Sequence, residues 1–231
     1  VNNTSKTASR DATSAVFGNT TTTSMIAIHA FFFSRYYIYR PIILFDLSGN
    51  DDSGDSLSGN TVSSATLQVT TLPDLDGFVD YVASTDNKLI VAKTDGVGSS
   101  INTADWNALD GWPSSGTYEG NVTKYGEITQ AADSTLDISL SAQAITDINS
   151  AISAGSDSFS MMILTEDDWT YDADLCASGT FEGLRIHSSN ASSSKPKLVL
   201  TYSAAPSGYS NKVSGVTSGN ISAVTNVATA N

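Results

Sequence analysis

The longest apolar stretch of the chain covers residues 25–47, and nearly every position in it is apolar. The stretch is about as long as a bilayer-spanning helix, which needs roughly 20 predominantly apolar residues. The stretch also holds two arginines, Pro41 and an aspartate. A charge at mid-membrane costs roughly 2.5 to 3.5 kcal/mol, and proline interrupts a helix. The pattern therefore predicts two adjacent strands, 25–33 and 36–47, each covered on both faces by a second sheet and by loops or a neighbouring subunit.

The rest of the chain contains shorter apolar segments separated by Gly, Ser, Asp and Asn. Residues 63–71 and 135–141 alternate apolar and polar positions, which is typical of half-buried strands. Four further segments have the length and composition of strands, with a weaker one near 15–17. The four are 86–96, 158–164, 181–187 and 195–203. Pro196 is compatible with the start of the last strand.

One segment has clear helical periodicity. Between Ser141 and Gly155 the apolar residues recur at helical spacing, with Ser141 as a plausible N-cap and Gly155 as a stop. The residues of this apolar stripe are Ala144, Ile145, Ile148 and Ile152. A shorter helix is predicted after residue 101, with Thr103 or Asp105 as its cap and an end near Gly111.

Together these patterns predict an all-β protein, an antiparallel β-sandwich or jelly roll with one or two short helices and an extended C-terminal tail. The expected divisions are a polar N-terminal arm (1–24), a sandwich domain (25–203) and a linker or stalk (204–231). The abundance of Ser, Thr and Gly agrees with short strands joined by turns.

The tail contains an 11-residue repeat, because 210–220 and 221–231 share the positions of their valines and of the final asparagine. The valines are Val213, Val216, Val224 and Val227. A repeat that cannot bury its apolar positions alone needs further copies of itself, so the tail is read as a stalk or a linker to further domains. A disordered tail remains the alternative.

The net charge of −13 argues against one class of binding partner, nucleic acid. Nucleic-acid binding needs clustered Lys and Arg, so nucleic acid is not an expected partner. The acidic residues are mostly Asp, which favours loops, where carboxylates either bind Ca²⁺ or keep the protein soluble. Cys176 is the only cysteine, so neither an intrachain disulfide nor a thiolate metal cluster is available.

Two segments hold candidate ligand-binding residues. The loop 165–174 combines five carboxylates with two aromatic rings, and three interpretations stay open: a Ca²⁺ site, a sugar-stacking loop, or a solvated loop whose rings pack on the sandwich. The candidate Ca²⁺ ligands are Glu166, Asp167, Asp168, Asp172 and Asp174. The candidate stacking residues are Trp169 and Tyr171 from this loop, together with Trp106 and Trp112 from the short helical segment predicted after residue 101.

No catalytic motif supports an enzyme. The two histidines, His29 and His187, lie in no metalloprotease pattern and beside no nucleophile elbow. Ser and Asp are so abundant that a hydrolase triad can be drawn around any histidine, so its apparent presence carries no information. We therefore expect no catalytic residues and no cofactor, Ca²⁺ apart.

Several segments, in order and spacing, resemble DNRLRE-type β-sandwich domains of bacterial surface proteins and tailed-phage structural proteins. They are RPIILFDLSG, VSSATLQV, INTADWN, TLDISLSAQAITDINSA and FEGLRIHSSNASSSKPKLVLTYS. The resemblance runs from about Asp11 to Ser203, with Arg40 and Asp46 as landmarks of its first motif. It departs at GNTTTTSMIAIHAFFFS, where the usual turn and strand are replaced. The resemblance implies a sandwich fold and says little about function, although some relatives bind polysaccharide.

The expected function is a non-enzymatic structural protein of a virus (phage) particle, such as a capsid decoration, fibre or tail component. Its partners would be further copies of itself and other virion proteins, without nucleic acid and without membrane insertion. The expected interface residues are Phe31, Phe32, Phe33, Tyr36 and Tyr37, together with the four tail valines. The alternative is an extracellular carbohydrate-binding or adhesive module of a bacterial surface protein.

Overall fold

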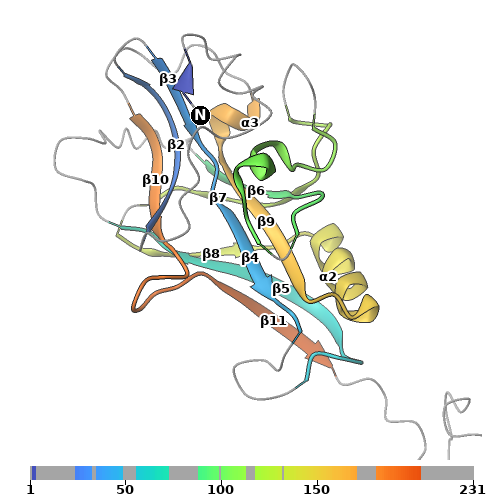
Figure 1. Cartoon of the computed structure of the whole chain (residues 1–231). Helices are drawn as coiled ribbons and strands as arrows, with labels where there is room; N and C mark the ends of the chain where they lie inside the picture. Colours follow the sequence, from blue (N-terminus) through green and yellow to red (C-terminus); the bar gives the residue numbers. More distant parts are fainter. Residues whose placement is uncertain are drawn as a thin grey trace, which may run out of the picture.

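The structure is a computed structural model that describes residues 2–3, 24–32, 35–48, 56–72, 88–98, 100–112, 118–131, 133–170 and 181–203 (Figure 1). The described residues form antiparallel strands in three hydrogen-bonded sheets, with few helices. The expected all-β antiparallel sandwich is confirmed. The tail valines and the weak strand near 15–17 lie outside the described residues.

The first sheet, named here the N-terminal sheet, has the strand order β1-β3-β2-β10. Its strands are β1 (Asn2–Asn3), β2 (Ser24–Phe32), β3 (Arg35–Tyr39) and β10 (Phe181–His187). Two residues of the polar arm, Asn2 and Asn3, thus pair with Tyr37 and Tyr36 of β3.

The other two sheets face each other across the main core. The central sheet has the order β4-β9-β6-β7, and the C-terminal sheet has the order β11-β5-β8. The central strands are β4 (Ile42–Asp46), β6 (Lys88–Lys93), β7 (Lys124–Thr129) and β9 (Ser158–Thr165). The C-terminal strands are β5 (Thr61–Thr70), β8 (Thr135–Ser139) and β11 (Lys197–Ser203).

The N-terminal and C-terminal sheets meet where β5 ends. Thr71 forms an isolated bridge with Ile186, and the amide of Leu72 donates to the carbonyl of Arg185 at 2.8 Å. These links make a single layer of the two sheets, opposite the central sheet (Figure 1).

The apolar run 36–47 is two strands, so the prediction of one strand there is wrong. β3 ends at Tyr39 and belongs to the N-terminal sheet, whereas β4 begins at Ile42 and belongs to the central sheet. Pro41 cannot donate to a strand ladder, and its ring restricts Arg40 before it. The chain therefore changes sheets at these two residues.

Both faces of the central sheet are buried. On one face the side chains join the other two sheets and helix α2 in one large cluster that includes Ile43, Val91 and Ile163. On the other face Ile90, Met162 and Leu164 form a second cluster with residues of the segment 109–122 and with Trp169. In β4, Ile43 is buried against the second sheet, while Ile42 is half-buried against the loops, so the expected cover on both faces is only partial there.

The predicted helix is confirmed together with both of its ends. Helix α2 spans Ala142–Ala154, the Ser141 side chain accepts a hydrogen bond from the amide of Ala144, and Gly155 ends the helix at φ +65°. Ala144, Ile148 and Ile152 are buried, so the apolar stripe packs on the core as its spacing predicts.

Two shorter helices lie on the outer side of the central sheet. The 3₁₀ helix η1 spans Thr103–Asn107, and its N-cap is Asn102, where Thr103 or Asp105 was expected. Asp105 instead completes a capping box by accepting from the amide of Asn102 at 2.8 Å. Helix α3 (Glu166–Thr170) follows β9 directly, in a segment expected to be a loop.

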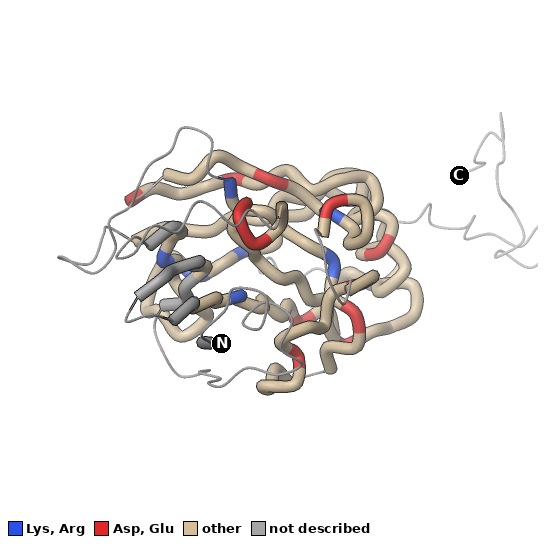
Figure 2. The backbone as a smooth tube through the Cα atoms, turned by 90° about the horizontal axis from the view of Figure 1, so that it is seen from above, with Lys and Arg blue, Asp and Glu red and all other residues tan. Residues whose placement is uncertain are grey.

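Charged residues are spread around the backbone in Figure 2, with acidic segments at several separate turns. No helix among the described residues is long and apolar enough to cross a membrane.

Candidate functional site

Two of the candidate stacking residues surround a buried arginine. Arg40 is 8% exposed, and its guanidinium carbon lies 4.2 Å from the ring centre of Trp106 and 4.9 Å from that of Trp112. The same carbon lies 5.4 Å from the ring of Tyr118. An arginine over indole faces at these distances makes favourable cation–π contacts.

The charge of Arg40 is balanced by Asp168, one of the candidate calcium ligands. Arg40 Nε donates to Asp168 Oδ2 at 2.6 Å, and Nη2 donates to Oδ1 at 2.9 Å. The two side chains are 0% and 1% exposed. This is a bidentate ion pair in a dry environment, a geometry in which the hydrogen bonds are strong and the loss of one partner leaves an uncompensated charge.

Further hydrogen bonds attach this pair to the loops over the central sheet. Nη2 of Arg40 also donates to the Tyr118 hydroxyl at 2.5 Å, and Nη1 donates to the carbonyl of Trp106 at 3.4 Å. The amide of Tyr118 in turn donates to the carbonyl of Trp169 at 3.0 Å. We refer to Arg40, Asp168, Trp106, Trp112 and Tyr118 as the Arg40 cluster.

Local structure positions each half of the cluster. Arg40 occupies the sheet change before Pro41, and the capping box of η1 fixes the turn that carries Trp106. Asp168 lies in the short helix α3, where its amide donates to the Thr165 hydroxyl at 3.4 Å. The side-chain positions thus follow from a proline-induced strand end and from two local caps.

The structure does not present the described tryptophans as an open sugar platform. Trp106 is 6% and Trp169 is 4% exposed, while Trp112 is half-buried and its ring contacts Arg40 and Tyr118. A pyranose needs an accessible ring face, which the two buried indoles lack. Tyr171 lies outside the described residues.

The described candidate calcium ligands lie in different environments. Asp168 is engaged by Arg40 and Asp167 is buried, while burial raises the pKa of Glu166 above its ordinary value. Within the described ranges no group of three His, Cys, Asp or Glu residues is placed to hold a metal ion. Asp172 and Asp174 lie outside those ranges, so the calcium prediction for the complete set stays a prediction.

Those of the expected interface residues that the structure describes lie on the N-terminal sheet. Phe31 and Phe32 are in β2, and Tyr36 and Tyr37 are in β3, where Phe31 pairs with Tyr36. Tyr37 is half-buried, and Phe33 is outside the described residues. Tyr39, which the sequence did not single out, is 40% exposed.

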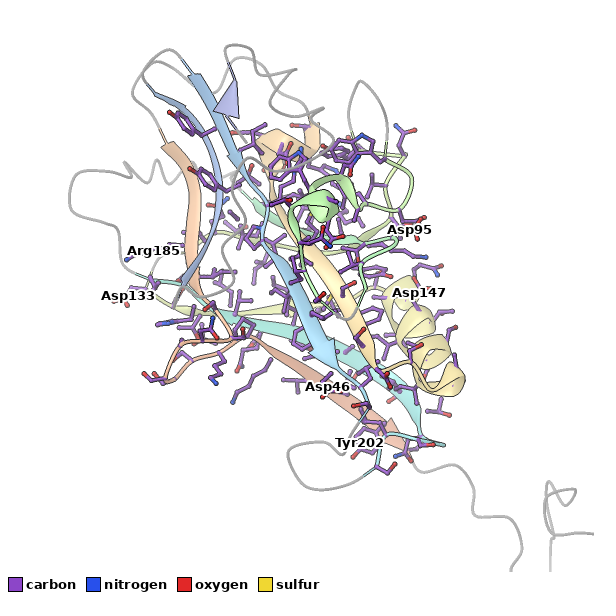
Figure 3. The ribbon with its side chains drawn as sticks, in the orientation of Figure 1. Asp46, Asp95, Asp133, Asp147, Arg185 and Tyr202 are labelled. Atoms are coloured by element: carbon purple, nitrogen blue, oxygen red, sulfur yellow. The ribbon has the colours of Figure 1, made fainter. Side chains whose placement is uncertain are left out.

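A second polar network, also missed from sequence, lies beside helix α2. The Tyr125 hydroxyl donates to Asp147 Oδ2 at 2.7 Å, and Lys93 Nζ lies 3.3 Å from the same oxygen and 3.5 Å from Asp110 Oδ2. Figure 3 shows Asp147 on α2. Burial opposes ionisation of Asp147, but hydrogen bonds from Tyr125, Gln143 and Lys93 outweigh it and lower its pKa. The network joins β6 and β7 to a carboxylate on helix α2.

The Tyr125→Phe variant tests this network through its pH dependence. Burial, followed by the hydrogen bond to Asp147, raises the pKa of Tyr125 far above its ordinary value. Such a group stabilises the fold fully below the unfolded-state pKa of about 10, and this stabilisation is lost as the pH rises further. Urea unfolding at a series of pH values should show the wild type losing stability above about pH 10 and the variant losing less. Equal alkaline slopes would contradict the network.

The Arg40 cluster shows how little signal long-range pairs leave in a sequence. In the sequence Arg40 is only a landmark of one motif, and its partner Asp168 lies 128 positions away. Tyr118 was not singled out at all, because a lone tyrosine beside an irregular segment has no periodic context. The usable signals in the sequence are the two tryptophans of the segment 106–112 and the acidic segment 166–168, and each of them predicts a separate ligand site.

No protein-family model matches the chain, and no curated protein matches it.

Proposed function

We propose that the chain is a non-enzymatic structural unit of a virus particle, a β-sandwich that assembles with further copies of itself and with other virion proteins. The resemblance of several segments to DNRLRE-type domains in phage structural proteins supports this setting. The resemblance supplies no ligand residue, so the geometry has to carry the argument for assembly.

One observation supports assembly: the large side chain of Tyr39 is exposed on β3, a strand made mostly of aromatic and aliphatic residues. Tyr39 and Val199 are the two exposed large hydrophobic residues in the described part of the chain. Tyr39 is paired with Ile28 and Tyr37 with Ala30 in the β2–β3 ladder, whereas Ile38 between the two tyrosines is 1% exposed. A contiguous exposed apolar patch is typical of a protein–protein contact, whereas single exposed residues are common, so Tyr39 marks the position where such a contact is proposed.

The Arg40 cluster favours assembly over ligand binding. The rings that a carbohydrate module would present are already packed around a guanidinium, and the carboxylate beside them is used by that guanidinium. A cluster closed in this way stabilises the fold, and it offers neither a reactive group nor an open stacking face.

Sedimentation velocity of the complete chain over the micromolar range tests the proposal. We expect association of the wild type, weakened in Tyr39→Ser because the contact loses an aromatic ring. Val199→Ser is the matched control, since it removes the other exposed hydrophobic residue from a different sheet. A monomer at every concentration, or equal effects of both changes, would count against assembly through the N-terminal sheet.

The second candidate is a carbohydrate-binding or adhesive module, and the partial exposure of Trp112 is the observation in its favour. Binding on a glycan array that disappears in Trp112→Ala would support it. Immunogold labelling of the native source would separate the settings, with label on particles expected here and label on cell surfaces expected for the module.

A further inference from the structure

The N-terminal sheet is connected to the central sheet by two chain crossings. In the first, β3 ends at Tyr39 and β4 begins at Ile42. In the second, β9 ends at Thr165, α3 follows at once, and the chain re-enters the N-terminal sheet at Phe181, the start of β10. In Figure 1 the labels of β3 and α3 lie at the same end of the molecule.

Each crossing supplies one half of the buried ion pair. Arg40 is the first residue after β3, and Asp168 is in the middle of α3. Their bidentate contact, at 2.6 and 2.9 Å, therefore ties the two crossings to each other. Because the hydrogen bonds to Tyr118 and to the carbonyl of Trp106 hold the same guanidinium, both crossings are also fixed to the loops over the central sheet.

The N-terminal sheet also lies against the other two sheets, with β2 beside β9 and β10 beside β5. It supplies Ala27, Leu184 and Ile186 to the large core cluster, which is otherwise built by the other two sheets, α2 and nearby loop residues. Two backbone links join β10 to the residues that directly follow β5. They are the Thr71–Ile186 bridge and the Leu72–Arg185 hydrogen bond. A sheet attached in this way is a candidate for opening as one cooperative unit, ahead of the remaining sandwich.

We propose that the Arg40–Asp168 pair is a clamp that holds the N-terminal sheet closed on the sandwich, and that loss of the pair lets β2, β3 and β10 open together. The clamp is a conformational device separate from assembly, although it acts on the sheet that carries Tyr39. It stands on the crossings and the ion pair, and it does not require that the sheet binds a partner.

Hydrogen–deuterium exchange of the complete chain, followed by peptide mass spectrometry, tests the clamp. In Asp168→Asn, which keeps the shape of the side chain and removes its charge, amides of β2, β3 and β10 should exchange faster by on the order of a hundredfold. Amides of β5, β6 and β9 should stay better protected than those of β2, β3 and β10, because they exchange only when the whole fold opens, and their rate should rise only as far as the overall stability falls. Glu127→Gln is the control, because Glu127 pairs with Lys88 and Lys124 at the surface and its loss should leave all three sheets unchanged.

Arg40→Lys provides a milder second variant, since lysine keeps the charge but cannot make the bidentate contact. It should accelerate the same three strands by a smaller factor, and it decides the question if Asp168→Asn fails to fold. Equal protection of all three sheets in the variants, or no acceleration of β2, β3 and β10, would overturn the clamp. These results are independent of the sedimentation experiment, so the clamp and the proposed assembly can fail separately.

Discussion

Replacing Arg40 by Met should destabilise the protein by about 3–5 kcal/mol, the cost of leaving a buried charge without its partner. Asp168 is 1% exposed and accepts two hydrogen bonds from Arg40, so the substitution strands a carboxylate among aromatic rings. Asp168→Leu should cost a similar amount, because it strands the guanidinium instead. The free energy of unfolding from urea titration measures both.

The double variant Arg40→Met with Asp168→Leu completes the cycle. Removing both charges together leaves no unpaired ion, so the double variant should lose clearly less stability than the sum of the single changes. Glu127→Gln again serves as a control and should change the stability by less than about 1 kcal/mol, because its ion pairs are partly exposed. Additive single effects would show that Arg40 and Asp168 do not interact as the geometry requires.

Replacing Gly111 by Ala should cost about 2–4 kcal/mol, from two sources of strain. Gly111 has φ +80°, a conformation that L residues rarely adopt, and an added Cβ would lie 2.0 Å from the carbonyl oxygen of Asn121. That oxygen is backbone, so neither segment can relieve the overlap by a side-chain rotation. The loop that covers the outer face of the central sheet would have to shift.

Gly120→Ala separates the two sources. Gly120 has nearly the same backbone conformation, φ +77°, but an added Cβ would meet nothing within 4 Å. Its substitution should cost only about 1–2 kcal/mol, the penalty of the left-handed conformation. Thermal unfolding of the two variants gives the difference, and equal losses would show that the close approach of Gly111 to Asn121 is not a constraint.

Elements governed by local rules were predictable. Helix α2 follows from a 3.6-residue stripe between a serine N-cap and a glycine C-cap, each of which acts within a few residues. Strand β5 likewise follows from alternation, with Ala65, Leu67 and Val69 buried. In such segments the order of apolar and polar residues along the chain predicts which side chains are buried.

Other elements leave weaker local signals. The sequence does not predict strand β7, because its residues KYGEIT alternate poorly and include a glycine. A Cβ at this position, Gly126, would lie only 2.8 Å from the carbonyl oxygen of Ser139, so the close packing of the two strands requires glycine. Helix α3 is only five residues long, too short for a period to be recognised. The sheet change at Arg40 carried a usable signal, since Pro41 restricts both strand pairing and the residue before it.

The candidate site was predictable only in part. The tryptophan pair of 106–112 and the acidic segment at 166–168 were both singled out, yet as separate ligand sites. Only the folded sheets bring Arg40 and Asp168 together, since 128 positions separate them. Their juxtaposition turns residues that look like ligand contacts into a closed structural cluster.

Whether the Arg40 cluster is closed can be measured directly by NMR. The result is decisive because an open cluster would restore a ligand site. The Nε–H signal of Arg40 can be assigned in a nitrogen–proton NMR spectrum by its disappearance in Arg40→Lys. With Nε donating to Asp168 at 2.6 Å and two indole rings over the guanidinium, the signal should exchange slowly with water and be displaced by ring currents. An Arg40 signal that exchanges like that of an exposed arginine would contradict the closed cluster.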